Sequence, residues 1–156
     1  MKKTVLLIAL LVGFGCEDED KDCAVVDCAG VCNGTAILVD DTCILQDIDG
    51  NQYPIITIGD QIWMAENLKV THYRNGNEIQ TGFSNSQWGS LSTGAYSVYD
   101  DNETNADTYG YLYNWYAVDD DRGICPAGWH VPSDNEFKQL EMALGMSQGQ
   151  ADSTGN

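Results

Sequence analysis

The fold is decided by the stretch ILQDIDGNQYPIITIGDQIWM, residues 44–64. Two apolar runs, residues 44–48 and 53–58, flank an Asp-Gly-Asn turn at 49–51, and this chemistry between apolar runs is typical of a hairpin. A second turn, Gly-Asp at 59–60, leads into a third run that ends at the close of the stretch. The stretch therefore predicts an antiparallel meander.

Shorter elements follow the meander. Residues 94–99 predict a further short strand, which carries the aromatic side chains of Tyr96 and Tyr99. The aromatic run YGYLYNWYAV, residues 109–118, is ambiguous between helix and strand. The spacing of Leu112, Trp115 and Tyr116 favours a short helix there.

A second helix has a clearer start. Residues 129–131 read as a strand, and after them Ser133 with Glu136 forms a capping box, which is typical of a helix N-terminus. Gly145 is a natural terminator for this helix. Its predicted apolar face consists of Phe137, Leu140 and Leu144.

Composition bounds the function. The 156 residues favour one domain, and a hydrophobic content of 43% is enough for a core. The 24 acidic residues outnumber the 7 basic ones and leave a formal net charge of −17. Such a surface repels phosphate backbones, so nucleic acid is excluded as a partner, whereas divalent cations and cationic or neutral ligands stay open.

The N-terminal segment MKKTVLLIALLVGFGC opens with two lysines and continues as an apolar run. A membrane-spanning helix needs about 20 apolar residues, so this shorter run predicts a signal peptide at residues 1–15. Small residues leading to Cys16 resemble the bacterial lipoprotein signal, in which that cysteine is lipidated. The alternative is an ordinary secretory signal with a nearby cysteine.

An acidic run, EDEDKD, directly follows Cys16. Blocks of like charge are usually solvated tethers, so residues 16–22 are predicted to be an acidic tether. The run also resembles the acidic stretch behind the lipidated cysteine of surface-exported lipoproteins in Bacteroidetes-like bacteria. We expect a lipid-anchored protein at the cell surface or outer membrane, or otherwise a secreted one.

Four cysteines cluster in residues 23–43. They are Cys23, Cys28, Cys32 and Cys43. Four thiolates can hold zinc, but the spacing lacks paired C-x-x-C knuckles and an exported compartment is oxidising. Two disulfides are therefore favoured, with all three pairings open. The segment resembles a short cysteine-rich repeat that serves as a spacer in secreted bacterial proteins.

Three long motifs carry a family resemblance. They are DIDGNQYPIITIGDQIWMAENLKVTHYRNG, GAYSVYDDNETNADTYGYLYNWYAV and RGICPAGWHVPSDNEF, in that order. Residues 44–156 resemble the N-terminal part of a Fibrobacter succinogenes major paralogous domain, found in surface and secreted proteins. That family is similar to the C-type-lectin-like superfold, which includes formylglycine-generating enzymes. The resemblance implies an α+β fold of antiparallel strands with one or two short helices.

The resemblance also implies that the domain is incomplete. The family usually continues with a Gly-rich, aromatic second half that ends in strands and a cysteine. Cys125 has no partner among the clustered cysteines. In a lectin-like fold it would bond a cysteine near the C-terminus of that second half, so the chain is expected to be a fragment and prone to aggregate.

Catalysis is not expected. The two histidines, His72 and His130, stand in no catalytic motif, and the structural interpretation of His130 is that it helps to fix the entrance of the following helix. The catalytic cysteine pair of the formylglycine-generating enzymes is not visible in this sequence. An oxidase of that kind therefore stays a remote alternative.

Two ligand types have candidate residues. For calcium, the candidate ligands are the hard oxygens of Asp100, Asp101, Asn102 and Asp107, with a solvated acidic loop as the alternative. No other cofactor is expected.

Aromatic residues suit sugar stacking, and Trp88 and Tyr96 are the candidates, although such residues also build cores. The sequence thus predicts a non-catalytic surface binding or adhesion module. Its partners would be the membrane, through the N-terminal lipid, and glycans or surface proteins, with glycans favoured. The alternative is a structural surface-display protein without a small ligand.

Overall fold

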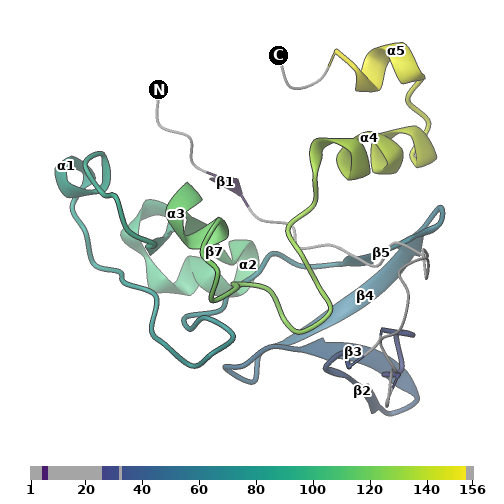
Figure 1. Ribbon diagram of the computed structural model, residues 1–156, viewed down its shortest axis with the longest axis horizontal. Coiled ribbons are helices and arrows are strands. Elements are labelled where there is room, and N and C mark those ends of the chain that lie inside the picture. Colours follow the sequence, from purple (N-terminus) through teal and green to yellow (C-terminus); the bar gives the residue numbers. More distant parts are fainter. Residues whose placement is uncertain (1–4, 7–25, 32, 154–156) are drawn as a thin grey trace.

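The predicted hairpin forms around a single carboxylate. Strands β3 (Thr42–Gln46) and β4 (Gln52–Ile58) pair antiparallel on either side of the turn (Figure 1). Oδ1 of Asp47 accepts hydrogen bonds from the backbone N–H groups of Asp49 and Asn51, both at 2.9 Å. These bonds satisfy backbone N–H donors that would otherwise lack an acceptor in the turn.

The computed structural model describes residues 5–6, 26–31 and 33–153.

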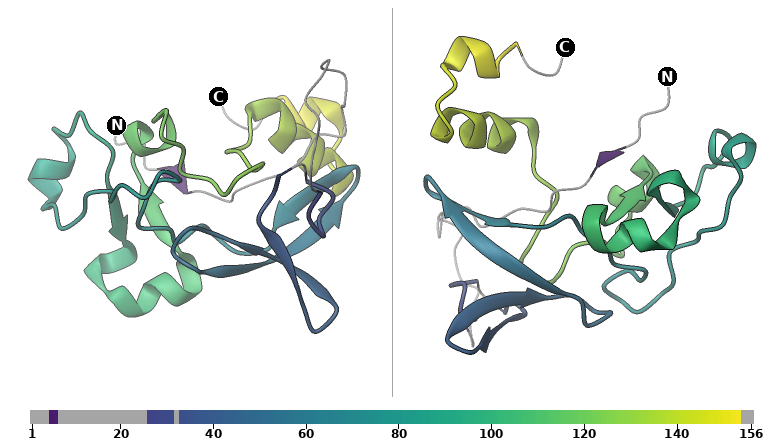
Figure 2. Two further views of the ribbon diagram at one scale, coloured as in Figure 1. Left: turned by 60° about the horizontal axis from the view of Figure 1, so that its bottom comes forward. Right: turned by 180° about the vertical axis from the view of Figure 1, so that it is seen from behind.

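The meander is confirmed and extended by one strand. The sheet has the order β2-β3-β4-β5, with β2 at Ala36–Val39 and β5 at Gln61–Met64, and every pair is antiparallel. Figure 2 shows it as a twisted ribbon. Strand β2 and the start of β3 belong to the predicted cysteine-rich spacer, residues 23–43. The spacer therefore shares a sheet with the domain that follows it.

A second sheet confirms the predicted strand near residue 96 and corrects the next element. Its order is β1-β7-β6, with β1 at Val5–Leu6, β7 at Tyr111–Tyr113 and β6 at Tyr96–Val98. The short helix expected over residues 109–118 is wrong for residues 111–113, which form β7, and is correct for α3 (Trp115–Val118).

A long-range contact explains the correction. The hydroxyl of Tyr113, at the end of β7, is buried and donates a 2.7 Å hydrogen bond to the carbonyl oxygen of Val70. Asn114 follows directly, and its side-chain oxygen accepts from the N–H of Ala117 at 3.0 Å, which caps α3. The aromatic run is thus divided at Asn114 into a strand and a helix.

The remaining helices are short except one. They are α1 (Asn85–Trp88), the 3-10 turns η1 (Tyr99–Asp101) and η2 (Glu103–Asn105), α2 (Ala106–Tyr109), α4 (Asp134–Ala143) and α5 (Gln148–Ala151). The capping box of Ser133 and Glu136 is present at the start of α4, as predicted. The predicted strand at residues 129–131 is reduced to a single β-bridge at His130, which follows a turn in which the N–H of Trp129 donates to the carbonyl oxygen of Pro126.

Helix α4 covers one end of the four-stranded sheet (Figure 1). Its Phe137 ring lies 5.6 Å from the Trp63 ring, centroid to centroid, and Leu140 packs against the same tryptophan. Leu144 does not join this face. It lies beyond the helix end, before the left-handed Gly145 (φ 108°), and is 69% exposed.

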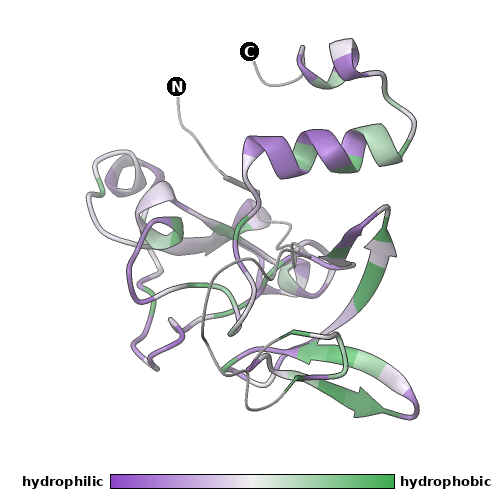
Figure 3. Ribbon diagram, turned by 45° about the vertical axis from the view of Figure 1, so that its right-hand side comes forward, coloured by the Kyte–Doolittle hydropathy of each residue, from purple (hydrophilic) through white to green (hydrophobic). Residues whose placement is uncertain are grey.

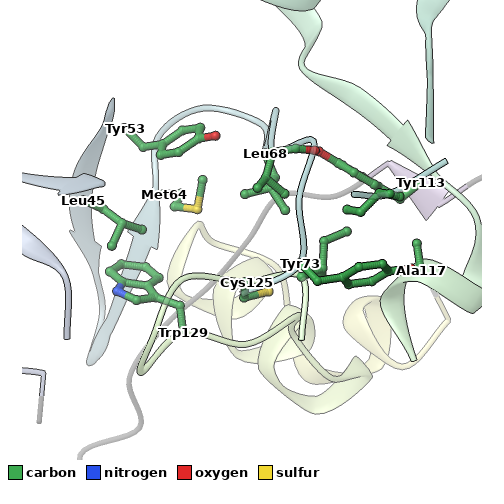
Figure 4. Close-up of a cluster of buried hydrophobic side chains, with 12 residues drawn as sticks. Leu45, Tyr53, Met64, Leu68, Tyr73, Tyr113, Ala117, Cys125 and Trp129 are labelled. Carbon is green, nitrogen blue, oxygen red and sulfur yellow. The ribbon is translucent and has the colours of Figure 1, made fainter. Parts of the chain in front are cut away.

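The main core joins the four-stranded sheet to the loops and short helices beside it (Figure 4). Its buried members are Leu45, Tyr53, Met64, Leu68, Val70, Tyr73, Ile79, Tyr113, Ala117, Ile124, Cys125 and Trp129. They come from both sheets, from α3 and from the loops between them. The fold is therefore of the α+β class, with antiparallel sheets and a few short helices.

The outer edge of the larger sheet is apolar. Strand β2 exposes Ile37, Leu38 and Val39, of which Leu38 is 67% exposed, and Figure 3 shows the β2–β3 hairpin as largely hydrophobic.

In the part of the chain that the structure describes, none of the helices has the length and apolar character needed to cross a membrane.

Candidate functional site

A cavity of about 280 Å³ brings together two groups of residues that the sequence predicted for different ligands. Trp88 was predicted to stack on sugars, whereas Asp100 and Asp101 were predicted to bind calcium. All three line the same cavity. Its other lining residues are the apolar Phe83, Val98 and Leu112 and the polar Asn85 and Ser97. The walls thus combine ring faces with hydrogen-bonding groups.

Trp88 is positioned by a capped helical turn. Ser84 and Gln87 form a capping box at the start of α1, and the N–H of Trp88 donates to the carbonyl oxygen of Ser84 at 2.8 Å. The side chain stays partly exposed, in contrast to Trp63 and Trp129, which are 2% and 3% exposed. Trp88 is therefore a wall of the cavity and not a member of either core.

Asp100 and Asp101 line the cavity from a segment with an uncommon backbone conformation. Both residues lie in the left-handed region, with φ of 58° and 51°, which Asp and Asn tolerate better than most residues. The loop is held on its far side by Asn105, whose amide donates a 2.9 Å hydrogen bond to the carbonyl oxygen of Tyr99. Both aspartates remain exposed.

The four predicted calcium ligands do not converge. The side-chain oxygen of Asn102 caps η2 by accepting from the N–H and hydroxyl of Thr104. Asp107 lines a different cavity of about 260 Å³, together with Glu66 and Lys69. Among the described residues, no group of three or more His, Cys, Asp or Glu side chains is placed to hold a metal ion.

Tyr96 lies in an aromatic cluster. Its ring centroid is 4.6 Å from that of Tyr111 and 6.2 Å from that of Tyr113, across the β6–β7 pair. It is partly buried against the main core, and this burial raises the pKa of its hydroxyl. Its neighbours Ser97 and Val98 line the Trp88 cavity, whereas Tyr96 does not.

Each histidine is bonded to one carboxylate. His130 Nε2 lies 2.7 Å from Oε1 of Glu136, the capping-box residue of α4, which is the contact expected of a side chain that fixes the helix entrance. His72 Nδ1 pairs with Asp49 at the hairpin turn. Sequence reasoning missed this second pair, because its members meet only through the packing of the turn against the segment at Thr71.

A cation stacks on an aromatic ring outside the Trp88 cavity. The guanidinium carbon of Arg122 lies 3.9 Å from the centroid of the Tyr73 ring. The same guanidinium donates two 2.7 Å hydrogen bonds to Asp120, which hold the pKa of that carboxyl at about 2. This arrangement consists of an aromatic face and a carboxylate around one positive charge.

The sequence of the folded part matches a described family. The family is the Fibrobacter succinogenes major domain, and the match covers residues 56–156, well over half of the chain. The chain belongs to this family. The resemblance found in the three long motifs is thereby confirmed. No curated protein and no solved structure matches the chain, so its likeness to C-type lectins stays an expectation.

The cysteines lie on both sides of the start of the Fibrobacter succinogenes major domain. Ahead of it, Cys28 and Cys43 form a disulfide, which confirms a disulfide in the cluster. Within it, Cys125 is a buried free thiol whose pKa burial raises to about 12. Apart from Val5–Leu6, the predicted signal peptide lies outside the described residues, as do the acidic tether, Cys16, Cys23 and Cys32.

Proposed function

We propose that this protein is a non-catalytic surface lipoprotein, anchored through Cys16, whose Fibrobacter succinogenes major domain binds glycans. The observation that carries the binding proposal is the mixed character of the Trp88 cavity. The faces of Trp88 and Phe83 suit the apolar face of a sugar ring. Asn85, Ser97 and the two aspartates offer hydrogen-bonding groups for hydroxyls.

The size of the cavity favours a small part of a glycan. Small-molecule pockets commonly measure about 300–1,000 Å³, and this cavity of about 280 Å³ lies just below that range. It therefore suits one sugar unit, at a chain end or on a branch, and not a long stretch of polysaccharide.

Export is supported by the N-terminal sequence and by the state of the thiols. The apolar segment of residues 1–15, Cys16 and the acidic run after it follow the order of a lipoprotein signal with a tether. The Cys28–Cys43 disulfide agrees with an oxidising compartment, where such bonds persist.

The proposal that the domain is not an enzyme rests on how its reactive side chains are used. His72 contacts the carboxylate of Asp49, which also accepts hydrogen bonds from Thr71, and His130 contacts the carboxylate of Glu136, which caps α4. The Cys125 thiol is buried, and its raised pKa keeps it protonated at neutral pH, so it is a poor nucleophile.

A second candidate function is a structural surface-display role without a small ligand. It is favoured by the exposed apolar strand β2, where Ile37, Leu38 and Val39 stand at the edge of a sheet. Edge strands of this kind pair readily with a neighbouring chain.

A glycan array probed with the full-length protein separates the two functions. Glycan binding predicts a signal that is lost in Trp88→Ala and kept in Trp115→Ala, a tryptophan that is 55% exposed and does not line this cavity. The signal should be the same with calcium and with a chelator, since the predicted ligands do not converge. An array without any signal would favour the structural role.

The lipid anchor has its own test. Cells that express the protein are labelled with a palmitate analogue, beside cells that express Cys16→Ala. Labelling of the wild type alone supports the anchor, whereas equal labelling of both proteins would contradict it.

A further inference from the structure

We propose that the Trp88 cavity recognises a positively charged amino group, so that the preferred glycan carries an amino sugar whose amine is free and not acetylated. This inference rests on the proposed glycan binding and adds the class of sugar. It starts from the cavity itself, whose wall holds two carboxylates beside a tryptophan.

The two carboxylates carry charge that the protein does not neutralise. Asp100 and Asp101 are exposed, and none of the ion pairs formed among the described residues includes either of them. No lysine or arginine lines the cavity. A ligand cation entering it would therefore meet negative charge without competing with a side chain of the protein.

The aromatic wall favours the same kind of ligand. A tryptophan face attracts a cation within about 6 Å more strongly than a tyrosine or phenylalanine face does. Trp88 is partly exposed, so its ring remains available to a ligand. An ammonium group held between Trp88 and Asp100 or Asp101 would gain a ring contact and charge-assisted hydrogen bonds together.

The chain already builds this arrangement once around its own cation. At the Tyr73 ring, Arg122 stacks at 3.9 Å and donates to Asp120. The Trp88 cavity repeats the aromatic face and the carboxylates, but the positive charge is not supplied by its lining residues. By analogy with the Tyr73 arrangement, the positive charge at the Trp88 cavity would be supplied by the ligand.

An amino sugar matches all parts of the wall. Its ring has an apolar face for Trp88 and Phe83, and its hydroxyls can bond Asn85 and Ser97. In its protonated form, the free amine can donate to a carboxylate. Acetylation makes that nitrogen a neutral amide, which removes the charge. The overall charge of −17 also attracts a cationic ligand from solution.

The test uses three oligosaccharides that share one linkage and differ only at carbon 2. They are a glucosamine oligomer, its N-acetyl counterpart and a cello-oligosaccharide of the same length, each titrated into the full-length protein. We expect the glucosamine oligomer to bind roughly tenfold tighter or more than the other two. A hydrogen bond to a charged group is more stabilising than one between neutral groups, and the difference in free energy corresponds to about that factor in affinity.

Matched variants locate the effect. Asp100→Asn with Asp101→Asn removes both charges while keeping side-chain shape and left-handed tolerance, and should bring the three affinities together. The control is Asp40→Asn with Asp41→Asn, an adjacent pair that is also left-handed, with φ of 48° and 62°, in the turn between β2 and β3. The control should leave the preference unchanged, and melting curves should show that both double variants fold.

Four results would overturn the inference. Equal binding of all three oligomers, lost in Trp88→Ala, would remove the amine preference and leave glycan binding standing. An equal loss in the two double variants would show general charge attraction without a site. Tight binding of polylysine that displaces the glucosamine oligomer would show that the cavity recognises a protein amine. No binding of any oligomer would remove the proposed function as well.

Discussion

The hydroxyl of Tyr53 donates a 2.6 Å hydrogen bond to Oδ2 of Asp47, and both side chains are buried. Tyr53 is a strand residue and Asp47 begins the hairpin turn, so the bond ties the turn to the sheet. The same hydroxyl accepts from the N–H of Lys69 at 3.1 Å, which adds the next segment of the chain. One tyrosine therefore joins the hairpin to the main core.

Tyr53→Phe should destabilise the domain. The change leaves the buried carboxylate of Asp47 with one donor fewer and the N–H of Lys69 without its acceptor, which should lower the free energy of unfolding by roughly 1–3 kcal/mol. Denaturant unfolding measures the loss, and Tyr116→Phe, at an exposed residue, is the control that should change little. Equal midpoints for the two variants would contradict the role of this hydrogen bond.

The Cys28–Cys43 disulfide should stabilise the edge of the larger sheet. It joins residues 15 apart in sequence, and a loop of that length corresponds to about 3 kcal/mol of chain entropy in the unfolded state. The double variant Cys28→Ala with Cys43→Ala should lose about that much unfolding free energy, with faster amide hydrogen exchange in β2 and β3. Unchanged exchange in both strands would argue against a structural role.

Cys125 should be unreactive until the domain unfolds. Burial raises its pKa to about 12, so almost no thiolate is present at neutral pH. A thiol reagent should label the native protein slowly and the denatured protein at once, and Cys125→Ala should abolish the denaturation-dependent signal. Rapid labelling of the native protein, absent in Cys125→Ala, would show that the thiol is accessible.

Acid should weaken the Asp120–Arg122 pair. The hydrogen bonds from Arg122 lower the pKa of Asp120 from 3.8 to about 2 in the folded state. A carboxyl with a lowered folded pKa stabilises the fold above its unfolded pKa and loses that contribution as the pH falls through the folded pKa. The contribution is therefore complete at neutral pH and declines between about pH 4 and about pH 2.

Melting curves across this range check the prediction. Arg122→Met keeps a long side chain over the Tyr73 ring but removes the charge, so its melting temperature should lie below that of the wild type at neutral pH. The difference should shrink as the pH approaches 2. A difference that stays constant with pH would show that Arg122 acts through packing alone.

Local signals in the sequence predicted the elements that depend on neighbouring residues. The Asp-Gly turn at 49–50 and the capping box of Ser133 and Glu136 both stand where they were expected. A tertiary contact accompanies the strand in the aromatic run, where the hydroxyl of Tyr113 bonds the carbonyl oxygen of Val70. Leu144 was misplaced for a local reason, because α4 ends before it. Periodicity alone therefore misplaced both residues.

The candidate site was predictable by residue type but not by grouping. Trp88 stood out as a candidate for sugar stacking and Asp100 as a candidate for calcium, yet their common cavity depends on how α1 packs beside β6 and η1. Tyr96 was chosen for the same reason as Trp88. Its contact with Tyr111 depends on the pairing of β6 with β7. That pairing could not be predicted, because the aromatic run at residues 109–118 is ambiguous between helix and strand.

The most direct test of glycan recognition at Trp88 measures affinity and stability on the same samples of wild type, Trp88→Ala and Trp63→Ala. Trp63 is buried in the sheet–helix core and should lose roughly 3–5 kcal/mol of unfolding free energy. Because Trp88 is a partly exposed cavity wall, Trp88→Ala should lose only about 1 kcal/mol of stability while its glycan affinity falls at least tenfold. A Trp88→Ala protein destabilised as strongly as Trp63→Ala, with its glycan binding unchanged, would contradict a binding role for the cavity.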